Sequence, residues 1–228
     1  MKKYLILIIV IINSCSYPEL ILNEIVYFNN FEEENLDGIS GGVISNYENN
    51  NVLGYYNKDG FNVNLNNIPE HDYVFISFDL YIHGSWDGNN NGFPTDDRPD
   101  LWIMELRPGM DLYKSSDSNT FKTTFSNTPC YSNWCRRQSF PQAYPFENNP
   151  TSGANKIHLP RTCKGYWGGP TSLYKIEKSF EHKGQGILLR IYDELFQPNA
   201  IDDQGFSAEM CDESWSIDNI EIRIVSYR

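Results

Sequence analysis

Oxygen-bearing side chains recur at every second residue of segment 87–92, which reads DGNNNG and ends on a glycine. Carboxylate and amide oxygens at positions i, i+2 and i+4 of a tight turn suit a hard cation such as Ca²⁺, which binds six to eight oxygens. Further acidic residues follow, and this many carboxylates would repel one another without a counter-charge. The sequence therefore predicts Ca²⁺ as a cofactor, and the ligands expected to converge on one ion are Asp87, Asn89, Asn91, Asp97 and Asp100.

The segment starts like an EF-hand loop but does not continue as one. The twelfth position of such a loop is a bidentate Glu, and here it is Arg98. No helical periodicity flanks the segment, so a helix–loop–helix site is disfavoured. The alternative to a cation site is a solvated polar turn, because Asn, Asp and Gly dominate turns.

The N-terminus has the form of an export signal. Two lysines precede an apolar run over residues 4–12, which is too short to span a bilayer. The next residues, 12–15, read INSC and resemble the lipobox of bacterial lipoproteins, in which the cysteine becomes the lipidated first residue. We therefore expect a signal peptide over residues 1–14, a lipid on Cys15 and a tether over residues 15–24. The alternative is an ordinary secretory signal that contains a cysteine.

The chain is acidic throughout. Removal of residues 1–14 takes away two of the 18 lysines and arginines, and the formal net charge moves from −12 to −14. Such a charge argues against nucleic acid or an anionic membrane surface as a partner. We expect the protein on the bacterial outer membrane or cell surface, attached only through its lipid anchor, or otherwise secreted.

Four cysteines remain after Cys15, an even number that suits an oxidising compartment. They allow three pairings. We favour Cys130–Cys135 as a local staple and Cys163–Cys211 as a long-range bridge. A zinc site is the alternative, but no C-x₂-C spacing is present.

Apolar and polar residues alternate with a period of two in many short stretches, which predicts β-strands. The clearest strand covers residues 74–83, and others are expected at 25–31, 61–65, 101–106, 121–125, 174–180 and 187–192. Turns rich in Gly, Asn and Pro separate them, and no 3.6-residue period competes. The sequence predicts an all-β, antiparallel jelly-roll β-sandwich that forms a single domain over residues 25–228.

The last predicted strand changes its inward face. Trp215 and Ile217 share one parity, whereas Ile220 shares the other with the apolar residues that follow. Alternation switches faces only at a bulge or bend, which falls at Asp218 and Asn219. This pair offers two further ligand oxygens, or it marks a plain edge bulge.

A long irregular insert interrupts the strands at residues 130–170. It is rich in Pro, Gly and Asn, it holds three cysteines, and its basic residues outnumber its acidic ones. Long structured loops in compact domains are usually functional. Aromatic faces stack on sugar rings and Arg forks hold carboxylate or sulfate. The sequence predicts a ligand site at Trp134, Arg136, Arg137, Tyr144, Arg161, Tyr166 and Trp167. Alternatively, these aromatic residues form a small core around the disulfides.

Catalytic motifs are scarce in this chain. It has no H-E-x-x-H, no G-x-S-x-G and no Gly-rich phosphate loop. Glu105 and Glu177 lie on predicted strands and could pair across a cleft as acid and base. The sequence therefore favours a non-catalytic protein over an enzyme.

Two short motifs carry a family resemblance. The stretches at 85–88, SWDG, and 212–220, DESWSIDNI, resemble elements of secreted jelly-roll modules found in bacterial surface lipoproteins and in lectin-like or MAM-like sandwiches. The resemblance implies that Asp218 and an N-terminal acid such as Glu32 share Ca²⁺ at the same or a neighbouring site.

The expected function is that of a non-catalytic, calcium-stabilised cell-surface lipoprotein module that binds an extracellular glycan or a surface protein. Two alternatives stay open, a secreted β-sandwich hydrolase acting on polysaccharide and a purely structural surface protein. The sequence gives no indication of oligomeric state.

Overall fold

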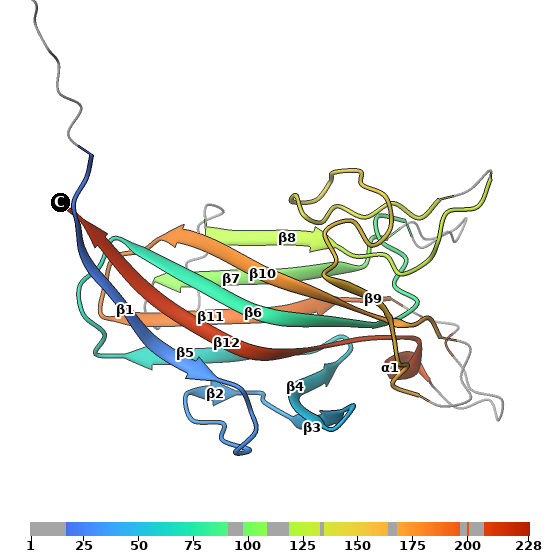
Figure 1. Cartoon of the computed structure of the whole chain (residues 1–228), viewed down its shortest axis with the longest axis horizontal. Helices are drawn as coiled ribbons and strands as arrows, with labels where there is room; N and C mark the ends of the chain where they lie inside the picture. Colours follow the sequence, from blue (N-terminus) through green and yellow to red (C-terminus); the bar gives the residue numbers. More distant parts are fainter. Residues whose placement is uncertain are drawn as a thin grey trace, which may run out of the picture.

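A computed structural model describes residues 17–90, 98–108, 119–132, 135–163, 168–196, 200 and 208–228. Two antiparallel sheets pack face to face (Figure 1). One has seven strands in the order β3-β4-β12-β6-β10-β9, with β1 also paired to β12, and the other has five in the order β2-β5-β11-β7-β8. The last three long strands, β10, β11 and β12, alternate between the sheets, as do β5, β6 and β7. The predicted antiparallel jelly-roll β-sandwich is therefore confirmed.

The seven-stranded sheet consists of β1 (Leu20–Asn29), β3 (Ile44–Tyr47), β4 (Asn50–Tyr56), β6 (Tyr73–Gly84), β9 (Lys156–Leu159), β10 (Thr171–Glu181) and β12 (Glu213–Tyr227). The five-stranded sheet consists of β2 (Ile39–Ser40), β5 (Gly60–Asn66), β7 (Leu101–Pro108), β8 (Thr120–Thr124) and β11 (Gly186–Glu194). A short helix, α1 (Glu209–Asp212), precedes β12. None of the described residues forms a helix with the length and apolar character of a membrane span.

The core lies between the two sheets, where period-two alternation places one apolar row from each long strand. Trp102 of β7 and Trp215 of β12 meet there edge to face, with ring centroids 6.0 Å apart, and both are fully buried. Burial of each such side chain contributes about 1.5–3 kcal/mol. This packing fixes the two sheets relative to one another, and with them the strand ends that carry the candidate site.

The predicted change of face in β12 is a bulge. The register shifts between Asp218 and Glu221, and Asn219 adopts a positive φ of 53°. Trp215 and Ile220, which flank the bulge, are both fully buried. β12 is an interior strand, so the edge-bulge alternative is wrong. Its neighbour changes from β4 to β1 at this point, which explains why the strand needs an extra residue there.

The structure corrects two predicted boundaries. β1 begins at Leu20, five residues before the predicted strand, so the tether over residues 15–24 is shorter than expected. Pairing with the far end of β12 draws these residues into the sheet. The insert over 130–170 also contains β9, which pairs with β10. In both places pairing with a distant strand, β12 for β1 and β10 for β9, produces the strand, and local alternation of apolar residues does not predict it.

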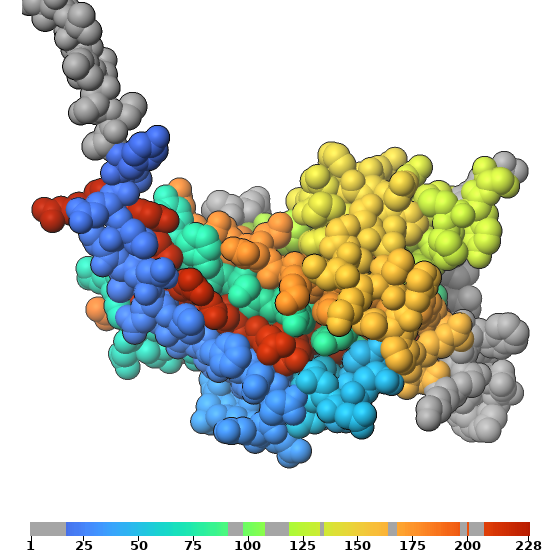
Figure 2. Space-filling view, viewed as in Figure 1, coloured from blue at the N-terminus to red at the C-terminus, as the bar shows by residue number. Residues whose placement is uncertain are grey.

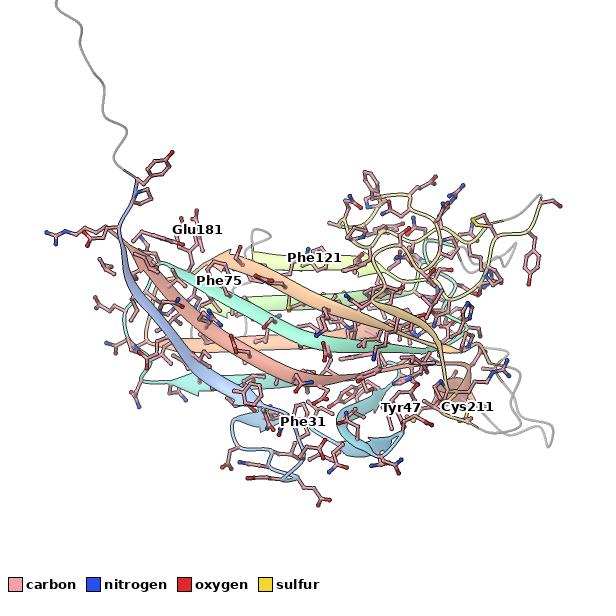
Figure 3. The ribbon with its side chains drawn as sticks, viewed as in Figure 1. Phe31, Tyr47, Phe75, Phe121, Glu181 and Cys211 are labelled. Atoms are coloured by element: carbon pink, nitrogen blue, oxygen red, sulfur yellow. A yellow bond between two sulfur atoms is a disulfide. The ribbon has the colours of Figure 1, made fainter. Side chains whose placement is uncertain are left out.

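Both predicted disulfides are present. Cys130 pairs with Cys135, and Cys163 pairs with Cys211 across 48 residues. The second bond joins the insert to α1, where Figure 3 labels Cys211. The insert is therefore stapled once within itself and once to the segment that precedes β12.

Two buried histidines beyond the strand ends predict a pH-dependent stability. His71 and His182 stack, with Nε2 of the first 2.8 Å from Nδ1 of the second. Burial, and to a smaller extent the neighbouring His71, lower the pKa of His182 from 6.5 to about 4. Between about pH 6.5 and pH 4, His182 binds a proton in the unfolded chain but not in the folded chain. The free energy of unfolding should therefore fall as the pH is lowered through this range.

Urea denaturation between pH 7 and pH 4 checks this expectation. His182→Gln should make the dependence on pH shallower than in the wild type, whereas His158→Gln, at an exposed position, should leave it unchanged. Equal pH profiles for the wild type and His182→Gln would contradict the assignment.

Candidate functional site

Three buried carboxylates meet where three strands end or begin. Asp87 follows β6, Asp100 precedes β7, and Glu213 is the first residue of β12. One carboxylate oxygen from each lies within 4.8 Å of the others, and their exposed fractions are 6%, 1% and 1%. We call these three residues the acidic cluster. It draws on both sheets, so its geometry depends on the whole sandwich.

Backbone hydrogen bonds hold the acidic cluster together. The amide of Asp87 donates to Oδ2 of Asp100 at 2.7 Å, and the amide of Asp100 donates to the carbonyl of Gly88 at 2.9 Å. Trp86 Nε1 donates to the carbonyl of Ser214 at 3.0 Å. The two motifs that carry the family resemblance, at 85–88 and 212–220, thus lie side by side although more than 120 residues separate them in the chain.

Three ionised carboxylates in the acidic cluster would be costly, because they are buried and close together. Burial raises the pKa of Asp100 well above its usual value, and the nearby Asp212 and Asp193 raise it further. Its Oδ1 atom is buried without a hydrogen-bond partner among the described residues. Asp87 forms an ion pair with Arg136 of the insert, which brings one positive charge to three carboxylates. Buried charge of this kind is costly unless it is neutralised.

These residues could hold one cation. Their carboxylate oxygens lie within 4.8 Å of one another, close enough to bind the same ion. Ca²⁺ binds oxygen ligands of this kind at about 2.3–2.6 Å. Ser126 pairs with Asp87 in an isolated bridge, and its buried hydroxyl has no partner among the described residues, which offers a further oxygen.

The predicted ligands of segment 87–100 have different positions. Asp87 and Asp100 belong to the acidic cluster, whereas Asn91 and Asp97 lie outside the described residues. The side chain of Asn89 is instead bonded to other groups. Its Oδ1 accepts from Ser139 at 2.8 Å and its Nδ2 donates to the carbonyl of Phe146 at 2.6 Å. Asn89 therefore ties the insert to this segment.

Sequence reasoning missed Glu213. It stands within the DESWSIDNI motif, but nothing in its local spacing connects it with Asp87, which lies 126 positions earlier. Only the pairing of β12 with β6 brings Glu213 opposite Gly84 and next to the segment that carries Asp87.

A second acidic group lies at the bulge of β12. The carboxylate of Asp218 accepts hydrogen bonds from Asn50 at 2.9 Å and from Asn219 at 3.0 Å. Burial raises the pKa of Asp218, and the charges of Asp79 and Glu32 raise it further. The charge of Glu32 thus acts on Asp218, and whether the two share an ion, as the resemblance implies, stays a prediction.

This group does not converge with the acidic cluster on one ion. Five residues of β12 separate Asp218 from Glu213, which is about 17 Å along a strand. Trp215 and Ile217 share the parity of Glu213 and point into the core, so Asp218 points to the opposite face. The residues expected to share one site, or two neighbouring sites, therefore form two separate groups, the acidic cluster and the group around Asp218.

The insert and the end of the sandwich form an open cavity of about 870 Å³. Residues 130–132 and Cys135 line one side of it, and Ile157 and His158 of β9 line another. Its lining also includes Asn127, Arg137 and Asn149. Tyr131 is 63% exposed. We call this space the insert cavity.

The predicted ligand residues scatter around the insert. Arg137 lines the insert cavity, whereas the adjacent Arg136 turns to Asp87. Tyr144 and Arg161 are exposed and are not among the described lining residues. Trp134, Tyr166 and Trp167 lie outside the described residues.

Part of the insert joins the main core, whereas the alternative interpretation expected a small core around the disulfides. Phe140 is 6% exposed, and its ring centroid lies 5.0 Å from that of Phe125 and 5.2 Å from that of Tyr174. The insert is thus anchored on the sandwich through Phe140.

A separate groove of about 350 Å³ crosses the outer face of the seven-stranded sheet, and residues from β1, β6, β10 and β12 line it. In Figure 2, β12 and β6 run diagonally between β1 and the insert. Phe75, labelled in Figure 3, lies in the groove with Glu177, Glu221 and Arg223. Arg223 and Glu221 form an ion pair at 2.6 Å. We call this the outer-face groove.

The acid–base pair that the sequence offered does not form. Glu105 lies on β7 of the five-stranded sheet, and Glu177 lies on β10 of the seven-stranded sheet. Each has the parity opposite to the core residues of its strand, so the two carboxylates lie on opposite outer faces of the sandwich.

Comparison with known proteins identifies no family. No family model matches the chain, and no curated relative does either. Among solved structures, the chain is similar to a carbohydrate-binding module, CBM28, described as specific for non-crystalline cellulose. The two share 12% identity over 88% of this chain and 92% of that chain, with a TM-score of 0.33. At this level the likeness bears on neither the ligand nor the site.

Proposed function

We propose that this protein is a non-catalytic, calcium-stabilised cell-surface lipoprotein module that binds an extracellular glycan in the insert cavity. The observation that carries the proposal is the lining of that cavity. An exposed ring, Tyr131, stands beside the amide of Asn149 and the guanidinium of Arg137 around about 870 Å³. Ligand sites typically combine aromatic surface with a few polar groups in this way.

The chemistry of a sugar suits this lining. A pyranose ring presents a C–H face that an aromatic ring covers, and its hydroxyls donate and accept hydrogen bonds. The Nδ2 of Asn127 donates hydrogen bonds to backbone carbonyls, among them that of Gly84 at 2.9 Å. Its Oδ1 is buried without a partner among the described residues and could accept from a sugar hydroxyl. The Cys130–Cys135 staple limits the loop ordering that binding would require.

The calcium in this proposal would be held by Asp87, Asp100 and Glu213. Its role would be to neutralise the acidic cluster, and it would take no part in chemistry. Three carboxylates that lie close enough to share one ion and the unpartnered Oδ1 of Asp100 support it.

The lipid anchor in this proposal is Cys15, which lies outside the described residues. β1 begins at Leu20, so a chain of five residues, about 17 Å when extended, would separate the lipid from the sandwich. The wild type should incorporate labelled palmitate and Cys15→Ala should not. Equal labelling of both would remove the anchor from the proposal.

A glycan panel tests the binding function. The non-lipidated Cys15→Ala protein should be retained on at least one immobilised polysaccharide, and Tyr131→Ala should lower that affinity about tenfold. Tyr144→Ala is the matched control, because Tyr144 is an exposed aromatic residue of the insert that does not line the cavity. An equal loss in both variants would place the ligand elsewhere. No retention on any polysaccharide would favour a purely structural surface protein.

One feature of the outer-face groove supports a second candidate, a hydrolase acting on polysaccharide. Glu177 of β10 and Glu221 of β12 both pair with Ser77 of β6, one from each side. Two strand spacings therefore separate their Cα atoms, about 10 Å. Inverting glycosidases hold two carboxyl groups about 6.5–9.5 Å apart, a separation that side chains on these positions can reach. Release of reducing ends that Glu177→Gln abolishes would establish this candidate, and retention without release would support the binding module.

A further inference from the structure

We propose that the insert cavity selects an acidic sugar, a uronate or a sulfated residue, through the guanidinium of Arg137. This inference rests on the proposed glycan-binding function and names the class of glycan. It starts from the charge of the cavity, which differs from that of the rest of the molecule. The whole chain has a net charge of −12, yet none of the described residues that line the cavity is Asp or Glu.

Arg137 has a different partner from other arginines of the sandwich. Arg107 and Arg190 pair with Glu105, Arg223 pairs with Glu221, and Arg136 pairs with Asp87. The guanidinium of Arg137 instead donates to Oδ1 of Asn149, a neutral amide. Asn149 thus orients the Arg137 fork without neutralising it, and no ion pair with a carboxylate forms at Arg137 among the described residues.

The backbone around Arg137 is fixed. Its carbonyl accepts from the amide of Asn89 at 2.7 Å. It also lies so close to Gly88 that a Cβ there would come within 2.1 Å of it, at a positive φ of 81°. The neighbouring Arg136 is held by its ion pair with Asp87. The backbone that carries Arg137 is therefore set before a ligand arrives, and the bond to Asn149 orients its guanidinium, which lowers the entropic cost of binding.

A guanidinium binds a carboxylate or sulfate through two parallel hydrogen bonds, and such charge-assisted pairs are about twice as strong as neutral ones. Tyr131, in the same cavity, supplies the ring on which the sugar stacks. In the outer-face groove, by contrast, Glu177 and Glu221 would repel an anionic chain. Of these two sites, the insert cavity is therefore the one that favours an acidic sugar.

Matched pairs of polymers test this inference, because one member of each pair is anionic and the other is neutral. The Cys15→Ala protein should bind polygalacturonate or dextran sulfate at least tenfold more tightly than methyl-esterified polygalacturonate or dextran. This preference should weaken as salt is raised. Arg137→Ala should abolish the preference, and Arg137→Lys should keep only part of it because the fork is lost. Arg190→Ala is the control, since Arg190 lies on the five-stranded sheet and pairs with Glu105.

Each outcome decides the inference. Equal or tighter binding of the neutral counterparts would overturn it while leaving the proposed glycan binding intact. Retention on neutral glycans alone would have the same meaning. No retention on any acidic or neutral polymer would overturn both. A preference for acidic polymers that survives Arg137→Ala would show that another group selects the charge, and it would overturn the assignment to Arg137.

Discussion

Millimolar Ca²⁺ should raise the melting temperature of this protein, and a chelator should lower it. Asp87, Asp100 and Glu213 bury three carboxylates within 4.8 Å, and Arg136 brings one compensating charge. An ion that binds only the folded chain stabilises it by about 2.7 kcal/mol at a hundredfold excess over Kd. For a domain of this size that corresponds to roughly 5–10 °C. Mg²⁺ should do less, because it requires shorter bonds and retains its waters.

Asp100→Asn gives the sharpest form of this test, because it removes one charge and keeps the shape of the side chain. The variant should lose most of the response to Ca²⁺. In chelator it should be at least as stable as the wild type, since an uncompensated buried charge is gone. Glu32→Gln, at the separate group around Asp218, should keep the response. Loss of the response in Glu32→Gln alone would move the ion to the bulge of β12.

The response to Ca²⁺ should also fade at acid pH. Burial raises the pKa of Asp100, so this carboxylate takes up a proton at a higher pH than an exposed one, and the proton then competes with the ion. Identical melting curves in Ca²⁺ and in chelator at neutral pH would mean that Arg136 and its neighbours already neutralise the acidic cluster.

The second large effect concerns the disulfide between Cys163 and Cys211. Replacing both cysteines by Ala should lower the free energy of unfolding by about 4 kcal/mol, because the bond closes a loop of 48 residues in the unfolded chain. The Cys130–Cys135 bond spans only five residues, and its removal should cost about 2 kcal/mol by the same reasoning. Urea denaturation of the two double variants measures both values.

The prediction is that the Cys163–Cys211 double variant loses more unfolding free energy than the Cys130–Cys135 double variant. Equal losses would show that strain or residual structure in the unfolded chain outweighs loop length. Peptide mapping without reduction should recover the two pairings found in the structure, and a peptide linking Cys163 to Cys130 would contradict them.

The sequence by itself determined the features that depend on local order. Residues 74–83 alternate strictly, and they form β6 with Ile76 and Leu80 fully buried. The change of parity after Ile217 marked the bulge at Asp218 and Asn219, because side chains in a strand alternate and a switch needs an extra residue. The cysteine count together with an export signal favoured the two disulfides that the structure contains.

Only the tertiary structure decided which distant residues share a site. Asp87 and Asp100 were predictable because 13 positions separate them on one loop. Glu213 joins them only because β12 pairs with β6, and Asp218 is kept from them by the face on which it lies. Asn89 has the residue type of a ligand, yet its hydrogen bonds to Ser139 and Phe146 assign it to the insert. A local pattern fixes the face that a side chain occupies within its own strand, but the strand pairing fixes its neighbours, because each contact between strands joins residues far apart in the chain.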